Sequence, residues 1–74
     1  MKIIFKNNGI IIELSFDKTA KGFVISRLDK HSDREISTID AFDSSWSEET
    51  IRFFFVSRIN AIIANGGEIK DIEL

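Results

Sequence analysis

The sequence predicts an α+β fold, in which four antiparallel strands form a meander and one long helix packs on one face of the sheet. Three observations lead to this prediction. Residues 45–67 carry the one long helical pattern in the chain. Residues 2–39 alternate between β-rich runs and short polar turns, and residues 68–74 form either a weak fifth strand or an ordered tail. The 74 residues contain no proline, internal repeat or linker, so we expect a single domain, 1–74.

Both ends of the predicted helix have recognisable signals. Ser45 followed by Glu48 fits a capping box, in which the serine oxygen accepts a backbone hydrogen bond and the carboxylate reaches back to the cap. Glu48 and Glu49 also place negative charge in the first turn, where the helix dipole favours it. The Asn-Gly-Gly run at 65–67 ends the helix, because glycine adopts the left-handed C-terminal conformation without steric cost.

The middle of the helix has one apolar face. Phe53 projects nearly opposite this face, so its ring either lies in water or packs against a loop or the C-terminal tail. Arg58 lies at the edge of the face, where its aliphatic stem covers the core and its guanidinium reaches solvent. The apolar stripe consists of Ile51, Phe55, Ile59 and Ile62, with Phe54, Val56 and Ile63 on its flanks.

The first two strands, Lys2 to Lys6 and Ile10 to Phe16, are predicted to form a hairpin with Asn8 and Gly9 as the central residues of a type I′ turn. One face of this hairpin is apolar and belongs to the core, whereas the other is mixed and faces solvent. The expected pairs are Phe5 with Ile12 and Ile3 with Leu14 on the core face, and Lys6 with Ile11, Ile4 with Glu13 and Lys2 with Ser15 on the outer face.

A third strand, Phe23 to Leu28, and a fourth, Glu35 to Ile39, extend the sheet. Polar segments at 17–22, 29–34 and 40–44 connect the strands and lead to the helix. The expected positions are Phe16 opposite Phe23 and Leu14 opposite Ile25 on the core face, Ile36 on the core face, Val24, Ser26, Leu28 and Ile39 on the outer face, Phe42 closing the core, and Trp46 beside it at the first helical position.

Composition excludes several classes of protein. The chain has no cysteine, and therefore no disulfide, thiolate metal site or cysteine nucleophile. With 43% hydrophobic and 30% charged residues, it has enough apolar material to fold and is not a disordered tail. The first residues contain no apolar stretch of the signal-peptide type, and no run approaches the length of a membrane span. We therefore expect a cytoplasmic protein without membrane association.

The residue types that carry chemistry do not form a recognisable site. The only histidine, His31, lies in a charged loop near Asp29 and Asp33, which argues against a catalytic base. Acidic residues around the helix start are oxygen ligands of the kind that Ca²⁺ and Mg²⁺ prefer, but their spacing is not that of an EF-hand. We predict no enzyme activity and no catalytic, cofactor or metal site. The acidic residues are Asp40, Asp43, Glu48 and Glu49.

Charge is distributed unevenly along the chain, whose net charge is −2. Residues 1–36 contain seven Lys and Arg against five Asp and Glu, whereas residues 37–74 contain three against seven. The composition of residues 37–74 therefore predicts a negative surface, which would repel nucleic acid and steer basic partners toward the protein. This surface includes Glu68, Asp71 and Glu73. The alternative is that these charges only keep a small, apolar-rich domain soluble.

Nucleic-acid binding through the basic loops of the N-terminal half is the main alternative function. Phenylalanines on a sheet can stack on unpaired bases, but Phe5, Phe16 and Phe23 belong to the predicted core face. The acidic net charge is also far from the basic footprint of a dedicated nucleic-acid-binding protein. The phosphate-binding residues in this alternative are Lys18, Lys21, Lys30 and Arg34.

The outer face of the sheet is the predicted interaction surface. Its strands carry more aliphatic residues than a face meant only for water, interleaved with charged and polar ones. An exposed sheet edge offers a second route, because it pairs with another copy or with an extended segment of another protein. The predicted partner-binding residues are Ile4, Ile11, Glu13, Val24, Leu28 and Ile39 on the sheet, Phe53 on the helix, and Asp40, Asp43, Glu48 and Glu49 on the acidic side.

These observations favour a non-enzymatic module that binds a larger protein stoichiometrically and regulates or inhibits it. By analogy of size and class alone, small cysteine-free α+β chains without an active site include accessory and inhibitory proteins carried by phages and other mobile elements. Homodimerisation would use the same surfaces and is the alternative to a heterologous protein partner. We expect neither nucleic acid nor a membrane as the partner.

Overall fold

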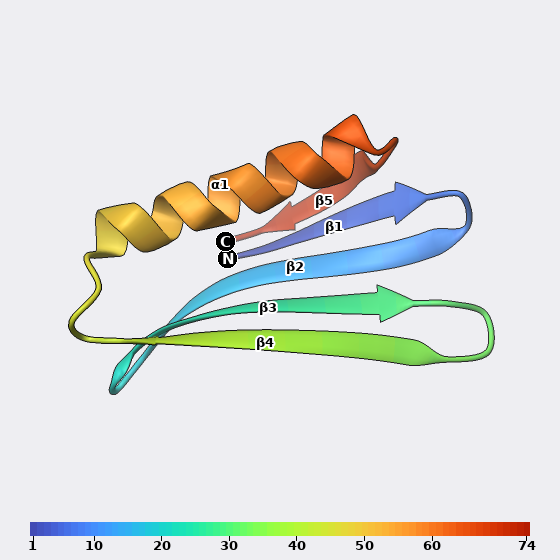
Figure 1. The fold of residues 1–74 in the computed structure, drawn as a ribbon. Helices are drawn as coiled ribbons and strands as arrows, with labels where there is room; N and C mark the ends of the chain where they lie inside the picture. Colours follow the sequence, from blue (N-terminus) through green and yellow to red (C-terminus); the bar gives the residue numbers. More distant parts are fainter.

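The computed structural model describes residues 1–74 and contains one five-stranded antiparallel sheet and one helix. In the sheet the strands are ordered β4, β3, β2, β1 and β5. Figure 1 shows α1 lying across one face of the sheet, while no element covers the other, which we call the bare face. The predicted α+β fold is confirmed, and the fifth strand is present. The elements are β1 (Lys2–Asn7), β2 (Ile10–Thr19), β3 (Gly22–Lys30), β4 (Glu35–Asp43), α1 (Glu48–Ala64) and β5 (Glu68–Glu73).

The hairpin of β1 and β2 has the predicted register. Asn8 and Gly9 have positive φ angles of 50° and 81°, as a type I′ turn requires at both central positions. All pairs predicted for this hairpin occur, including Phe5 opposite Ile12 on the face under α1. The turn residues therefore determine which side of both strands enters the core.

The pairing of β2 with β3 differs from the prediction by two residues. Phe16 lies opposite Ile25 rather than Phe23, and Leu14 lies opposite Arg27 rather than Ile25. Both strands are longer than their apolar pattern suggests, and they run on to a two-residue turn at 20–21. Because side chains alternate with a period of two, this shift leaves every residue on its predicted face.

The fourth strand extends to Asp43, whereas the sequence predicted a linker from Asp40 onward. Its last residues pair with the start of β3, where Gly22 has a φ of +151°. A Cβ at Gly22 would lie 2.8 Å from the carbonyl carbon of Asp43, so only glycine permits this close approach of the two strands. The polar composition of residues 40–43 concealed a strand that is specified by pairing with β3.

The apolar residues of β4 lie on their predicted faces, but α1 covers them unequally. Phe42 packs against the core, and its ring centroid lies 5.6 Å from that of Trp46, as predicted. Ile36 is on the helix side and remains 47% exposed, because α1 crosses the sheet diagonally and leaves this corner open (Figure 1). Ile39 is on the bare face and is 68% exposed.

The helix begins two residues later than the capping-box prediction required. Ser47 is the N-cap, and its side chain accepts a hydrogen bond of 3.2 Å from the amide of Thr50. Asp43 accepts hydrogen bonds from the backbone and the hydroxyl of Ser45, which holds that residue in a turn before the helix. The predicted capping box of Ser45 and Glu48 is therefore wrong, and Trp46 precedes the helix. The predicted stop is confirmed, since the chain leaves α1 at residues 65–66 with φ of +97° at the first glycine.

The fifth strand pairs with β1 and contains a bulge, which explains why its sequence does not alternate. Ile69 lies opposite Phe5 and Ile72 lies opposite Ile3, although the two isoleucines are three positions apart. The register shifts between these pairs, so Lys70 is the extra residue. The bulge brings both isoleucines to the helix side of the sheet.

The buried core lies between α1 and the three inner strands. Neither edge strand contributes a fully buried residue, and Phe42 of β4 is only partly buried. On the helix, Ile59 and Phe54 are also partly buried, while Val56 and Ile63 on one flank are about half exposed. The buried apolar residues are Ile3, Phe5, Ile12, Leu14, Phe16, Ile25, Ile51, Phe55 and Ile62.

Candidate interaction surfaces

The bare face carries all five aliphatic residues that the sequence predicted for partner binding. Since neighbouring strands pair without interruption across β1 to β4, these side chains form rows that cross the sheet. The first row contains Glu68, Lys6, Ile11, Lys30 and Glu35, the second Asp71, Ile4, Glu13, Leu28 and Ser37, and the third Glu73, Lys2, Ser15, Ser26 and Ile39.

The aliphatic residues on this face form two groups rather than one patch. Ile4 and Leu28 lie directly on either side of Glu13, and Ile11 precedes it by two residues on the same strand. All three are only partly exposed. The second group lies toward the edge formed by β4, where Val24 faces Ala41 and the side chain of Ile39 is largely exposed.

A network of charges occupies the centre of the bare face. Glu13 forms ion pairs with Lys30 of β3 at 2.5 Å and with Lys2 of β1 at 3.2 Å. Its side chain is only 15% exposed, so these interactions are partly shielded from water. The hydrogen bond from Lys30 lowers the pKa of the Glu13 carboxyl, and the same bond raises the pKa of Lys30. The network joins three strands at the middle of the sheet.

Three of the four acidic residues predicted to form an acidic side bind separate partners, and Glu49 is exposed in the first turn of α1. No three His, Asp or Glu side chains come close enough together to hold a metal ion. Hydrogen bonds from Ser45 lower the pKa of the Asp43 carboxyl. The interactions are Asp40 with Arg58 at 2.8 Å, Glu48 with Arg52 at 2.9 Å, and Asp43 with Ser45.

The side chain of Phe53 is 68% exposed, so the first of the two alternatives for this residue holds. Its nearest aromatic neighbour is Phe54, with ring centroids 6.5 Å apart. Phe54 in turn packs on Trp46 and Phe42, at 5.9 Å in each case. Phe53 is thus the outer member of an aromatic cluster that covers the end of β4.

Sequence reasoning missed an apolar hollow between α1 and the start of β1. It has a volume of about 440 Å³, and Arg52 stands at one side with its guanidinium carbon 5.3 Å from the centre of the Phe16 ring. Val56 supplied a signal as part of the apolar flank of the helix, but the sequence did not show that Met1 and Phe16 lie beside it. The lining residues are Met1, Phe16, Arg52, Phe55, Val56 and Ile59.

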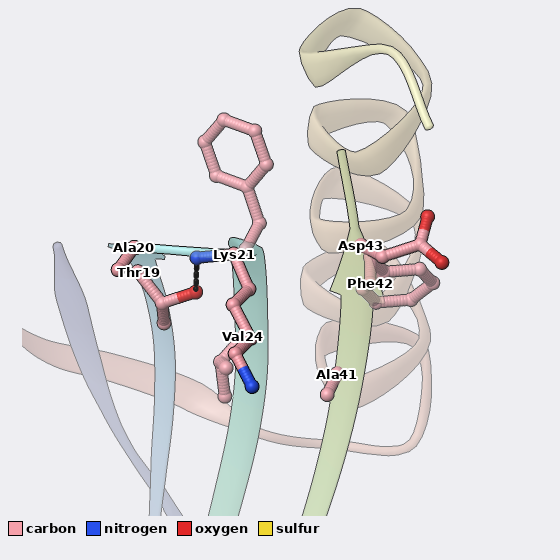
Figure 2. A pocket seen from close by; sticks show the side chains of 8 residues that line it. Thr19, Ala20, Lys21, Val24, Ala41, Phe42 and Asp43 are labelled. Atoms are coloured by element: carbon pink, nitrogen blue, oxygen red, sulfur yellow. Dashed lines mark hydrogen bonds between the residues drawn. The ribbon is translucent and has the colours of Figure 1, made fainter. Parts of the chain in front are cut away.

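A second hollow lies at the end of the sheet where the turn between β2 and β3 meets β4. Figure 2 shows Val24 and Ala41 on adjacent strands, with Asp43 and Phe42 further along β4. On the opposite side of the hollow, within the turn, the amide of Lys21 donates a hydrogen bond of 3.3 Å to the hydroxyl of Thr19. The hollow makes the apolar residues near β4 accessible from the end of the sheet as well as from its bare face.

Several of the basic residues proposed for phosphate binding lie in different places. Lys18 and Lys21 are exposed near the turn between β2 and β3, whereas Arg34 lies in the loop at the opposite end of β3. Lys30 is paired with Glu13. The structure therefore does not gather these side chains into one basic patch.

Comparison with protein-family models, with curated proteins and with solved structures gave no match to this chain. The structure contains no helix with the length and apolar character needed to cross a bilayer.

Proposed function

We propose that this protein is a non-enzymatic binding module that regulates or inhibits a larger protein by stoichiometric binding through the bare face of its sheet. The observation that carries the proposal is the group of Ile4, Ile11 and Leu28 around the partly shielded Glu13. A face that served only as a solvated surface would carry polar residues at these positions. Aliphatic residues beside a preorganised ion pair give a partner both apolar area and a fixed polar contact.

Charge on the margins of this face favours a partner with basic residues around its contact surface. The exposed carboxylates of Glu68, Asp71 and Glu73 end the three rows at β5, and Glu35 ends a row at β4. The lysines lie inside these margins, where Lys2 and Lys30 are already paired with Glu13. This arrangement supports electrostatic steering of a basic partner and disfavours the alternative of a phosphate backbone.

The test uses charged substitutions that the bare face can accommodate. Ile11 lies between Lys6 and Lys30, so Ile11→Glu places its carboxylate between two lysines and should leave the fold intact. Val24 lies opposite Asp17, so Val24→Lys is the equivalent change in the second aliphatic group. Val56→Glu is the matched control, because Val56 is half exposed on the helix, away from the bare face.

A tagged protein is used to capture partners from host lysate treated with nuclease, and the bound proteins are identified by mass spectrometry. We expect one stoichiometric protein that is retained by wild type and Val56→Glu and lost with Ile11→Glu or Val24→Lys. Circular dichroism confirms that each variant is folded. Full retention by both sheet variants would refute the bare face as the binding surface. A partner that is retained only in a parallel capture without nuclease would support the nucleic-acid alternative instead.

A further inference from the structure

The edge formed by β4 is long and unprotected. The strand has nine residues, and nothing lies beyond it in the sheet (Figure 1). It contains no lysine, proline or bulge, three of the features that natural proteins use to prevent edge strands from pairing with other chains. Its charged residues are Glu35 and Asp43 at the two ends and Asp40, which is paired with Arg58. Its residues are mostly exposed, and alternate backbone groups point away from β3 without a strand to bind. This edge is available for pairing.

The side chains of β4 repeat in mirror order about its central residue, Ile39. At equal distances in both directions there is a polar residue, then a small residue, then a large apolar residue, then a carboxylate. Two antiparallel strands related by a two-fold axis place residues at equal distances from the axis opposite each other. The matching pairs are Thr38 and Asp40, Ser37 and Ala41, Ile36 and Phe42, and Glu35 and Asp43.

We propose that β4 pairs antiparallel with β4 of a second copy of this chain, about a two-fold axis at Ile39, and joins two five-stranded sheets into one of ten strands. This register places Ile39 opposite Ile39 of the second copy on the bare face. On the helix side it places Ile36, 47% exposed in the single chain, opposite Phe42 of the second copy.

The proposed pairing accounts for the exposed apolar residues at this side of the molecule. Trp46 is 46% exposed and contacts Phe42, so an isoleucine from the second copy extends the same aromatic cluster. The register also places Glu35 opposite Asp43 of the second copy, which opposes pairing at both ends of the strand. Lys30 lies directly opposite Glu35 in β3 and offsets part of this repulsion.

The pairing would give the dimer one continuous bare face with two copies of the aliphatic group around Glu13. It does not depend on the proposed heterologous partner, because Ile11 lies on β2, two strands away from β4. Loss of dimerisation and loss of partner binding can therefore be observed separately.

Cysteine cross-linking tests the register, since the chain has no cysteine of its own. In the proposed dimer, position 39 faces itself at the distance of a directly opposed strand pair, about 5 Å between Cα atoms. Ile39→Cys should therefore form an intermolecular disulfide readily under mild oxidation. Ile36→Cys is the control, because two copies of position 36 lie about 20 Å apart along the paired strands. Equal cross-linking at both positions, or none at position 39, would overturn the register.

Sedimentation equilibrium over a wide concentration range tests the association itself. We expect wild type to dimerise and Ile39→Lys to weaken the association by about tenfold or more, because two lysines would face each other at the axis. Val56→Lys introduces the same charge at a half-exposed position away from β4 and should dimerise as wild type does. A monomer at all concentrations, or equal association of all three proteins, would overturn the proposal.

Discussion

The two edges of the sheet differ in how they are protected. The edge at β5 has six residues, a bulge at Lys70 and three carboxylates, Glu68, Asp71 and Glu73. The edge at β4 also has three carboxylates, Glu35, Asp40 and Asp43, but its nine residues pair regularly with β3 and include no basic residue. A bulge and a lysine hinder an edge from accepting another strand, and only β5 has them. The comparison indicates that this protein closes one edge of its sheet and leaves the other available.

The edges also differ in what holds them to the rest of the molecule. Phe42 of β4 packs on Trp46 and Phe54, and Asp40 of the same strand pairs with Arg58 of α1 at 2.8 Å. Ile69 and Ile72 of β5 remain 44% and 50% exposed, so this strand depends mainly on its ladder with β1. The available edge is thus the better anchored one, as a binding surface requires.

The largest expected effect comes from removing the anchor of β4. Phe42→Ala deletes a partly buried ring and its contacts with two aromatic neighbours, and should lower the free energy of unfolding by about 2 to 3 kcal/mol. Ile72→Ala on β5 removes a half-exposed side chain and should cost about 1 kcal/mol. Urea unfolding of both variants measures the difference. Equal losses would show that the two edges are held equally well.

The sequence predicts best where a local signal determines the structure. Asn8 and Gly9 specify their turn without help from the rest of the chain, so the register of the first hairpin is correct. The helix face is also predicted correctly, because Ile51, Phe55 and Ile62 follow a regular period and are all buried. These features depend on residues close together in the sequence.

The incorrect predictions concern features that depend on distant partners. Ser45 and Ser47 both suit an N-cap, and the choice depends on Asp43, whose carboxylate binds Ser45. The bulge at Lys70 can be recognised only from the pairing of β5 with β1. The positions on the bare face are predicted correctly, but the charge network at Glu13 is not, because it needs lysines from two other strands.

A smaller effect is expected at Glu13, whose lysines also connect the centre of the sheet to both edges. Lys2 lies opposite Glu73 of β5, and Lys30 lies opposite Glu35 of β4. Glu13→Gln removes the central carboxylate and should lower the free energy of unfolding at pH 7 by about 1 kcal/mol. Lys2 and Lys30 still lie opposite Glu73 and Glu35 in the variant, which limits the loss of free energy of unfolding.

The effect of Glu13→Gln should depend on pH. The hydrogen bond from Lys30 lowers the pKa of Glu13 in the folded protein, so ionised Glu13 stabilises the fold. This stabilisation is complete above the unfolded pKa of about 4.3 and is lost as pH falls through the lower folded pKa. Urea unfolding of wild type and variant should therefore converge progressively as the pH falls below about 4.3 and through the lower folded pKa of Glu13. A difference that stays constant down to about pH 2 would contradict this role.

Deletion of Lys70 should cause the smallest change in the free energy of unfolding. This deletion also tests the comparison of the two edges most directly. Without this residue the sequence of β5 alternates regularly, and Ile69 and Ile72 keep their positions opposite β1. Stability should change by only about 0.5 kcal/mol, since the extra residue makes no ladder pair. The flattened edge should then associate with other copies, as β4 is proposed to do.

Sedimentation in an Ile39→Lys background isolates this new association from pairing through β4. Lys70→Ala keeps the bulge and removes only the charge, so this control should remain monomeric in the same background. If deletion of Lys70 leaves the protein folded and equally monomeric, the bulge does not protect the edge. The three carboxylates of β5 would then be sufficient to prevent pairing at that edge. In β4, the position of Glu35 and Asp43 at the ends of the strand would then favour pairing more than the absence of lysine does.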